Sequence, residues 1–423
     1  MTSTVAPVTE ARLRAAHRSV LVVFALAGIA FAAWASRIAD AKHALHLTPG
    51  QLGAVLLATS AGSLIALPSA GRIVGRVGVA TTIRIGLSMS LVGLTVVGIG
   101  VSVASVPLVA AGGLFVVGSG IGIWDVSMNL EGATVERLLG RTTMPLYHAS
   151  FSGGTVASAF VGALMSWRHV SVLLHLVAVA VLVLAVGVWQ LRDFLPRELE
   201  SEEADTDAES VASGERPRSA WLEPRTLLVG LVVLAAAFTE GTANDWLSVA
   251  FVDGHDLPTW AGVLAFAVFL SAMTVGRIVG TSILDRHGRV PVVRATFVLA
   301  VVGSLMVVFG PAWLAYAGAA VWGVGASLGF PVGMSASADD PKRAAARMST
   351  VATIGYAAFI AGPPLLGFLG DHFGVLRALL AVTVLIAVAL LVVPAVAPLP
   401  RSTRPDAEPD VATGGREAQA SDR

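Results

Sequence analysis

Cysteine is absent from the 423-residue sequence, which excludes disulfide bonds and thiolate metal sites. Charge is scarce: charged residues make up 13% of the chain, against about 25% in a typical soluble protein. The net charge is zero, so nothing indicates a nucleic-acid partner. No HExxH zinc pair, intramembrane DDxxD-like cluster or GxxxxGK[ST] loop is found. We therefore expect no catalytic residue, metal or cofactor, and ATP-driven transport within this chain is unsupported.

Apolar residues dominate instead, at 55% of the chain with a mean hydropathy of +0.77. A bilayer core requires about 20 apolar residues per helix. The first apolar run is followed by a second and not by a polar mature chain, so we interpret it as a retained helix and not a signal peptide. This pattern predicts an all-α integral membrane protein with twelve transmembrane helices, at residues 20–39, 51–71, 83–102, 107–131, 144–166, 170–190, 226–249, 259–281, 291–309, 312–336, 348–369 and 375–396.

Lysine and arginine set the predicted orientation, because cytoplasmic loops of membrane proteins are enriched in both. If the N-terminus lies inside, the opposite side holds only Arg37, Lys42, Arg168 and Arg377. The reverse orientation would break the rule at almost every loop. We therefore expect a multi-pass protein of the cell inner membrane with both termini in the cytoplasm.

The polar segments divide the chain into five parts: a cytoplasmic N-terminal segment (1–18), a six-helix bundle (19–191), an acidic cytoplasmic linker (192–225), a second six-helix bundle (226–397) and a disordered cytoplasmic tail (398–423). The halves echo one another: Gly71–Gly78 matches Ser282–Arg289, and the glycine pair 118 and 120 matches the pair 323 and 325. Such duplication is typical of carriers that rock two bundles about a central site.

The segment Asp285-Arg286-His287-Gly288-Arg289 resembles the loop motif GxLxDRxGR of the major facilitator superfamily. The first-half copy departs from it, with Gly75 where the motif has Asp. A looser similarity, to the fucose–galactose–hexose-type symporters, lies in the run Gly118 to Asn129 with Asp125, followed by His148. The family resemblance implies two six-helix bundles, transport by alternating access, and a cavity lined by the first, fourth, seventh and tenth helices. It does not distinguish uniport, symport and antiport.

Ionisable groups inside a membrane helix cost at least about 2.5–3.5 kcal/mol, so they are candidates for function. Glu240 is placed deepest on a helix that the resemblance puts at the cavity. Burial favours its neutral form, and a change of hydration would tie protonation to conformation. We predict Glu240 as the proton-coupling carboxylate, with Asp125 second. The predicted cavity residues are Trp34, Arg37, Asn129, His148 and Asn244.

Charged residues near the helix ends are predicted gates. Asp285 is expected to lie against the N-terminus of the eleventh helix, where unpaired N–H groups favour negative charge, with Arg286 and Arg289 pairing with nearby acids. On the outer side we expect Arg37 to pair with Asp245. On the inner side, Arg277 is expected to meet Asp125 or His148.

Each candidate has an alternative interpretation. The motif arginines also satisfy the positive-inside rule, His148 suits a packed histidine, and Trp34 suits an interfacial aromatic belt. Asp245 is equally compatible with a place at the interface. The sequence predicts a secondary active transporter of a small solute, coupled to protons and monomeric, whose partners are solute, protons and lipid. A sensor or facilitative channel of the same fold is the alternative, and an intramembrane enzyme is the weaker one.

Overall fold

The computed structural model describes residues 9–195, 219–340 and 343–399, and the described chain is helical almost throughout. Its α-helices are α1 (Glu10–Ala35), α2 (Ile38–Ala44), α3 (Pro49–Val77), α4 (Val79–Ser102), α5 (Pro107–Leu139), α6 (Met144–Trp167), α7 (Val172–Gln190), α9 (Pro224–His255), α10 (Thr259–His287), α11 (Arg289–Phe309), α12 (Ala312–Ala326), α13 (Gly329–Ser337), α14 (Ala344–Phe373), α15 (Val375–Ala378) and α16 (Leu380–Val392). Short 3-10 helices are η1 (Leu191–Asp193), η3 (Ala220–Leu222) and η4 (Val393–Val396).

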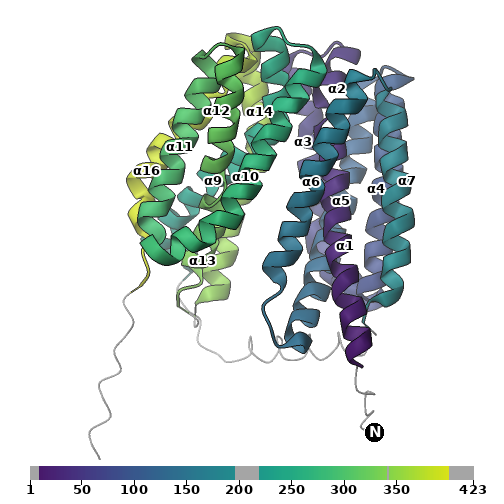
Figure 1. The fold of residues 1–423 in the computed structure, drawn as a ribbon, viewed down its shortest axis with the longest axis vertical. Coiled ribbons are helices and arrows are strands. Elements are labelled where there is room, and N and C mark those ends of the chain that lie inside the picture. The colour runs from purple at the N-terminus through teal and green to yellow at the C-terminus, as the bar shows by residue number, and fades with distance from the viewer. Residues whose placement is uncertain (1–8, 196–218, 341–342, 400–423) are drawn as a thin grey trace, which may run out of the picture.

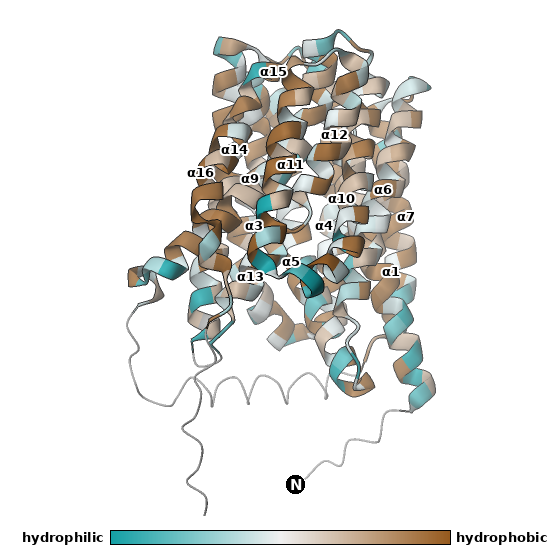
Figure 2. Ribbon diagram, turned by 60° about the vertical axis from the view of Figure 1, so that its left-hand side comes forward, coloured by the Kyte–Doolittle hydropathy of each residue, from teal (hydrophilic) through white to brown (hydrophobic). Residues whose placement is uncertain are grey.

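Twelve of the described helical segments are long and apolar enough to cross a membrane, as the sequence predicts. Hydrophilic residues gather near the two ends of the helices, and apolar residues dominate between them (Figure 2). Two spans are interrupted: Ser36 and Arg37 separate α1 from α2, and Ser327 and Leu328 separate α12 from α13. Prolines 363 and 364 lie inside α14, which continues through them.

Several segments are longer than predicted. Helix α1 begins at Glu10, so part of the expected N-terminal segment is helical, and α9 continues to His255, six residues beyond its predicted end. The beginning of the expected linker packs on the first bundle, where Phe194 and Leu195 are buried. The end of that linker is partly helical, with η3 at Ala220–Leu222 and α9 beginning at Pro224. Residues 196–218 of the linker and the tail from residue 400 lie outside the described residues, so the prediction for them is not tested.

The helices form two bundles, α1 to α7 and α9 to α16 (Figure 1). Within the first, α3 and α4 pack against α5, and α1 packs against α6. Within the second, α9 packs against α14, and α12 packs against α10 and α11. The bundles meet mainly through two helix pairs, α3 with α14 and α6 with α10, and the short helix α2 also contacts α9 and α10. This is the paired architecture that the internal duplication predicts.

Glycine ends helices where the chain reverses direction at once into the next helix. Gly78, Gly288 and Gly374 have φ values of 81°, 77° and 83°, in the left-handed region that other residues rarely adopt. Each is both the C-cap of one helix and the residue before the next. These tight connections keep consecutive spans antiparallel and adjacent.

We call the end of the molecule where α1 begins and η4 ends the terminal face, and the opposite end the distal face (Figure 1). The bundles are tied together at the distal face. There the N–H of Gly50, in the first turn of α3, donates to Asp371 at the end of α14 (3.0 Å). Behind this contact the helix backbones touch, because a Cβ atom on Gly53 would lie 2.4 Å from the carbonyl oxygen of Pro363. The distal face is therefore closed.

Candidate functional site

A cavity of about 270 Å³ lies between the two bundles, bounded by α1, α3, α5 and α14. Asp125 on α5 is the one acidic or basic residue among those that line it, and its side chain is exposed. Half of the other lining residues are aromatic or carry a hydroxyl: Phe31, Thr59, Ser60, Ser63, Tyr356 and Phe359. The other half are leucine, isoleucine and glycine. Tyr356, on α14 of the other bundle, lines the same cavity as Asp125. The cavity therefore has one acidic side chain in a wall that is otherwise uncharged and partly apolar.

Small residues bring α5 close enough to α3 to form this wall. A Cβ atom on Gly118 would lie 1.9 Å from the carbonyl oxygen of Thr59, so this position requires glycine. Asp125 is seven residues further along, on the same face of α5. Asn129 donates to the backbone carbonyl of Asp125 (2.8 Å) and approaches its Oδ1 (3.4 Å). The predicted face of α5 is confirmed, with Asn129 beside Asp125.

Glu240 is in an ion pair, which the sequence analysis did not predict. Oε2 of Glu240 on α9 lies 2.8 Å from an NH2 nitrogen of Arg277 on α10. Both side chains are partly accessible, at 23% and 31% exposed. The predicted seventh helix ended at residue 249, whereas α9 runs from Pro224 to His255 and is centred on Glu240. The prediction therefore placed Glu240 and Arg277 at different depths in the membrane.

Arg277 also approaches a helix break in its own bundle. Its Nε approaches the carbonyl of Ser327, at the break between α12 and α13 (3.4 Å). His148 lies on α6, which packs against α10 across the interface. His148 is exposed and lies edge-on to Phe24, with ring centroids 5.3 Å apart. In this arrangement Arg277 pairs with Glu240, and the expected inner pair with Asp125 or His148 stays a prediction for a different state.

The other predicted cavity residues do not line the cavity. Trp34 is buried in the core, and Asn244 is buried with no hydrogen-bond partner for Oδ1 among the described residues. The predicted pair of Arg37 with Asp245 is wrong for this state, in which the distal face is closed. Arg37 instead pairs with Asp40 (3.0 Å) and donates to the carbonyl of Val170 (2.6 Å), both in its own bundle.

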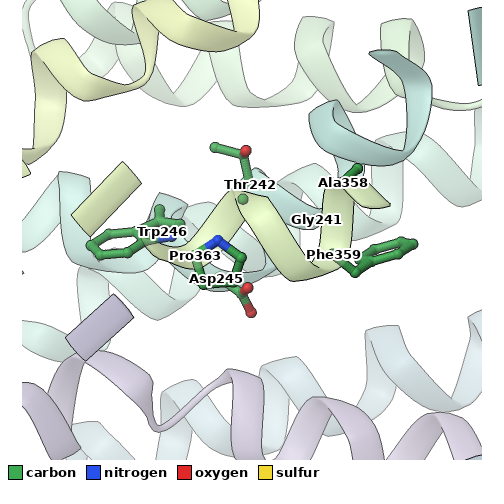
Figure 3. Close-up of a pocket in the computed structure, with 8 residues that line it drawn as sticks. Gly241, Thr242, Asp245, Trp246, Ala358, Phe359 and Pro363 are labelled. Atoms are coloured by element: carbon green, nitrogen blue, oxygen red, sulfur yellow. The ribbon is translucent and has the colours of Figure 1, made fainter. Parts of the chain in front are cut away.

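Asp245 lines a separate small pocket between α9 and α14. Its carboxylate lies beside Pro363 and Phe359, with the Trp246 ring on the other side of the proline (Figure 3). Phe359 lines both this pocket and the larger cavity. Asp245 and Asp125 therefore lie in neighbouring pockets that share one side chain of α14. Among the described residues no ion pair to Asp245 is found, and none to Asp125.

At the terminal face, Asp285 and Arg286 are exposed. No hydrogen bond from the N-terminus of α14 to Asp285 is found among the described residues, and α10 packs against α6 of the other bundle. Arg289 does pair with an acid, Oδ1 of Asp339 (2.7 Å), and Arg225 pairs with the other oxygen of Asp339 (2.8 Å). Although burial opposes it, hydrogen bonds from these two arginines lower the pKa of Asp339.

The polar contacts that close the distal face were missed. Lys42 on α2 pairs with Asp253 on α9 (2.8 Å), and Nε2 of His43 lies 3.4 Å from the same carboxylate. The hydroxyls of Ser166 and Thr259 are 3.0 Å apart across the interface. A signal for one such residue existed: Asp371 precedes Gly374 by three positions, as Asp285 precedes Gly288. The described residues contain no cluster of metal-ligating side chains.

Comparison with known proteins identifies the class. The profile of the Major Facilitator Superfamily matches residues 19–286 and 260–420, so the chain belongs to this family of transporters. It is 31% identical over 363 residues to the uncharacterized transporter y4wD of Sinorhizobium fredii, covering 85% of this chain and 92% of the relative. The protein is thus a membrane transporter and not an enzyme.

Two solved structures share the fold. The nucleoside transporter NupG superposes with a TM-score of 0.70 at 12% identity, covering 90% of this chain and 98% of that one. The fucose:proton symporter FucP of E. coli superposes with a TM-score of 0.55 at 16% identity, covering 90% and 100%. At these identities the likeness concerns the fold alone.

Proposed function

We propose that this protein is a proton-coupled secondary transporter of a small solute in the cell inner membrane, with its terminal face in the cytoplasm. The excess of lysine and arginine in the loops of that face supports the orientation. With the distal face closed, the described arrangement is then an inward-facing state. The solute binds in the cavity around Asp125, and rocking of the two bundles exposes it alternately to either side.

The ion pair of Glu240 with Arg277 carries the proposal of proton coupling. It lies inside two membrane-spanning helices, and one partner is a carboxylate that can take up a proton. Protonation of Glu240 removes the charge that holds Arg277 and leaves a partly buried cation without its partner. Such a cation is unfavourable and is drawn to the nearest alternative acceptor.

Those acceptors lie in the other bundle. Asp125 has no cationic partner among the described residues, and His148 lies on α6, the helix of the first bundle that packs against α10. A new pair between Arg277 and the first bundle would draw α10 toward α6 and close the cytoplasmic side. Proton uptake at Glu240 is thereby converted into the change from inward-facing to outward-facing.

Glu240→Gln tests this mechanism, because the neutral amide imitates the protonated acid. A thermal-shift screen first identifies a solute that stabilises the purified protein. In proteoliposomes the variant should lose accumulation driven by a pH gradient and retain solute exchange at equal pH. Asp245→Asn, which removes an acid without an observed ion pair on the same helix, serves as the matched control.

Continued accumulation by Glu240→Gln in response to a pH gradient would exclude Glu240 as the coupling site. Loss of both accumulation and exchange would instead make it a solute ligand. A facilitative channel of the same fold is also distinguished here, because a channel shows no acceleration of uptake by solute on the opposite side.

A further inference from the structure

Three prolines lie inside long helices among the described residues, and each follows a residue that lines the cavity around Asp125 by four positions. They are Pro68 in α3 and the consecutive pair Pro363 and Pro364 in α14. Proline has no N–H, so the carbonyl four residues earlier loses its helical hydrogen bond. Counting back four residues gives Leu64, Phe359 and Ile360.

Each of these three residues is at the wall of the cavity around Asp125. The three residues whose carbonyls lose their helical donor therefore all line the cavity, and two of them are adjacent on α14. A carbonyl left without a donor in a membrane helix requires a partner from a side chain, water or a ligand. Breaks in helical hydrogen bonding at the bilayer centre supply ligand-binding carbonyls in transporters of other folds.

The rest of the wall adds further groups that can accept a hydrogen bond. Asp125 contributes a carboxylate, and Thr59, Ser60 and Ser63 contribute hydroxyls along one side of α3. Oγ1 of Thr59 is buried without a hydrogen-bond partner among the described residues. No lysine or arginine is among the lining residues, and the nearby Arg277 is neutralised by Glu240.

We propose that the solute is a donor-rich molecule, neutral or cationic, with several hydroxyl or amino groups on a compact body, and that the proline-freed carbonyls help to select it. A carboxylate or phosphate solute would meet the like charge of Asp125, with no lysine or arginine in the wall to offset it. The rings of Phe31, Tyr356 and Phe359 cover the apolar faces of the solute. This inference rests on the proposed solute-binding role of the cavity, and it does not depend on proton coupling.

The test measures binding at equilibrium without any pH gradient, so a failure of coupling cannot affect it. Purified protein is screened by thermal shift against triads that share one skeleton and carry a hydroxyl, an amine or a carboxylate, beginning with glucose, glucosamine and glucuronate and extending to pentose and aliphatic triads. Stabilisation is expected from hydroxyl or amine members. Stabilisation by carboxylate members at least as strong, or by no hydroxyl or amine member, would overturn the proposal.

Variants then locate the site for whichever triad member stabilises the protein. Pro363→Ala and Pro364→Ala restore an N–H donor to one carbonyl each, so each should weaken binding about 2- to 10-fold, the value of one hydrogen bond. Asp125→Asn should weaken it further. Pro331→Ala is the matched control, because Pro331 lies in the first turn of α13, where N–H groups have no helical partner. Unchanged affinity in both Pro363→Ala and Pro364→Ala, or an equal loss in Pro331→Ala, would overturn the assignment of these carbonyls.

Discussion

Removing the charge of Asp253 should open the distal face. This carboxylate on α9 contacts Lys42 on α2 at 2.8 Å, and the pair joins the two bundles. At an effective dielectric constant of about 20, two unit charges at this separation attract by roughly 6 kcal/mol before desolvation is subtracted. The side chains are 12% and 22% exposed, so the pair lies between a surface bridge and a buried one. We expect Asp253→Asn to weaken closure by about 1–3 kcal/mol.

That range changes the ratio of outward-facing to inward-facing protein by about 5- to 150-fold. The absence of cysteine makes the change measurable. Ser63→Cys places a thiol in the cavity, where a membrane-impermeant maleimide added to intact cells reaches it only when the distal face is open. In the Asp253→Asn background the labelling rate should rise several-fold, and Lys42→Gln should act in the same direction.

Two further variants distinguish a specific ion pair from general loosening. Asp256→Asn removes an equal charge three residues away, at an exposed C-cap, and should leave the rate unchanged. The exchange of both partners, Lys42→Asp with Asp253→Lys, should restore slow labelling. Rates in Asp253→Asn equal to those of the parent, or raised equally by Asp256→Asn, would refute the assignment of this pair to closure.

Three other predictions follow from the same contacts. Gly53→Leu should keep α3 away from Pro363 and raise Ser63→Cys labelling from outside, whereas Gly71→Leu, with open space around it, should not. Because the pKa of Asp339 is lowered, its contribution to stability is complete above about pH 4 and is lost as pH falls through the lowered value. Thermal unfolding should therefore show Asp339→Asn less stable by about 1–3 kcal/mol at pH 7, with a smaller difference near pH 3; an equal difference at both pH values would contradict this. For orientation, His46→Cys should be labelled from outside intact cells and Ser213→Cys should not; labelling of Ser213→Cys would reverse the assigned topology.

The fold was predictable from sequence because a membrane imposes it. Long apolar runs, sparse charge and the repeated glycine motifs suffice for twelve helices in two bundles, and the structure confirms them. The face of α5 that carries Asp125 was also predictable, because the 3.6-residue period aligns it with Gly118. Both inferences use local spacing alone.

The partners of charged residues were not predictable in the same way. Arg37 was assigned to Asp245 from matching depth, yet it pairs with Asp40, three residues along its own chain. A helix break at Ser36 and Arg37 makes that local contact possible, and no pattern in the sequence marked the break. Glu240 and Arg277 were assigned to different depths because the predicted helix ends were several residues too early. Pairing depends on tilt and on true helix length, which hydropathy does not report.

The most direct measurement of the central claim is the effect of Glu240→Gln on the distance between the two bundles at the terminal face and at the distal face. Spin labels on introduced cysteines at Arg141 and His287 would report the terminal face, and labels at His46 and Asp256 the distal face, since all four positions are exposed. Pulsed electron paramagnetic resonance then gives the distance distribution of each pair. If protonation of Glu240 releases Arg277 to the first bundle, Glu240→Gln should shorten the terminal-face distance and lengthen the distal-face distance. Distributions identical to those of the parent, or both distances lengthening together, would contradict proton-driven alternating access through this ion pair.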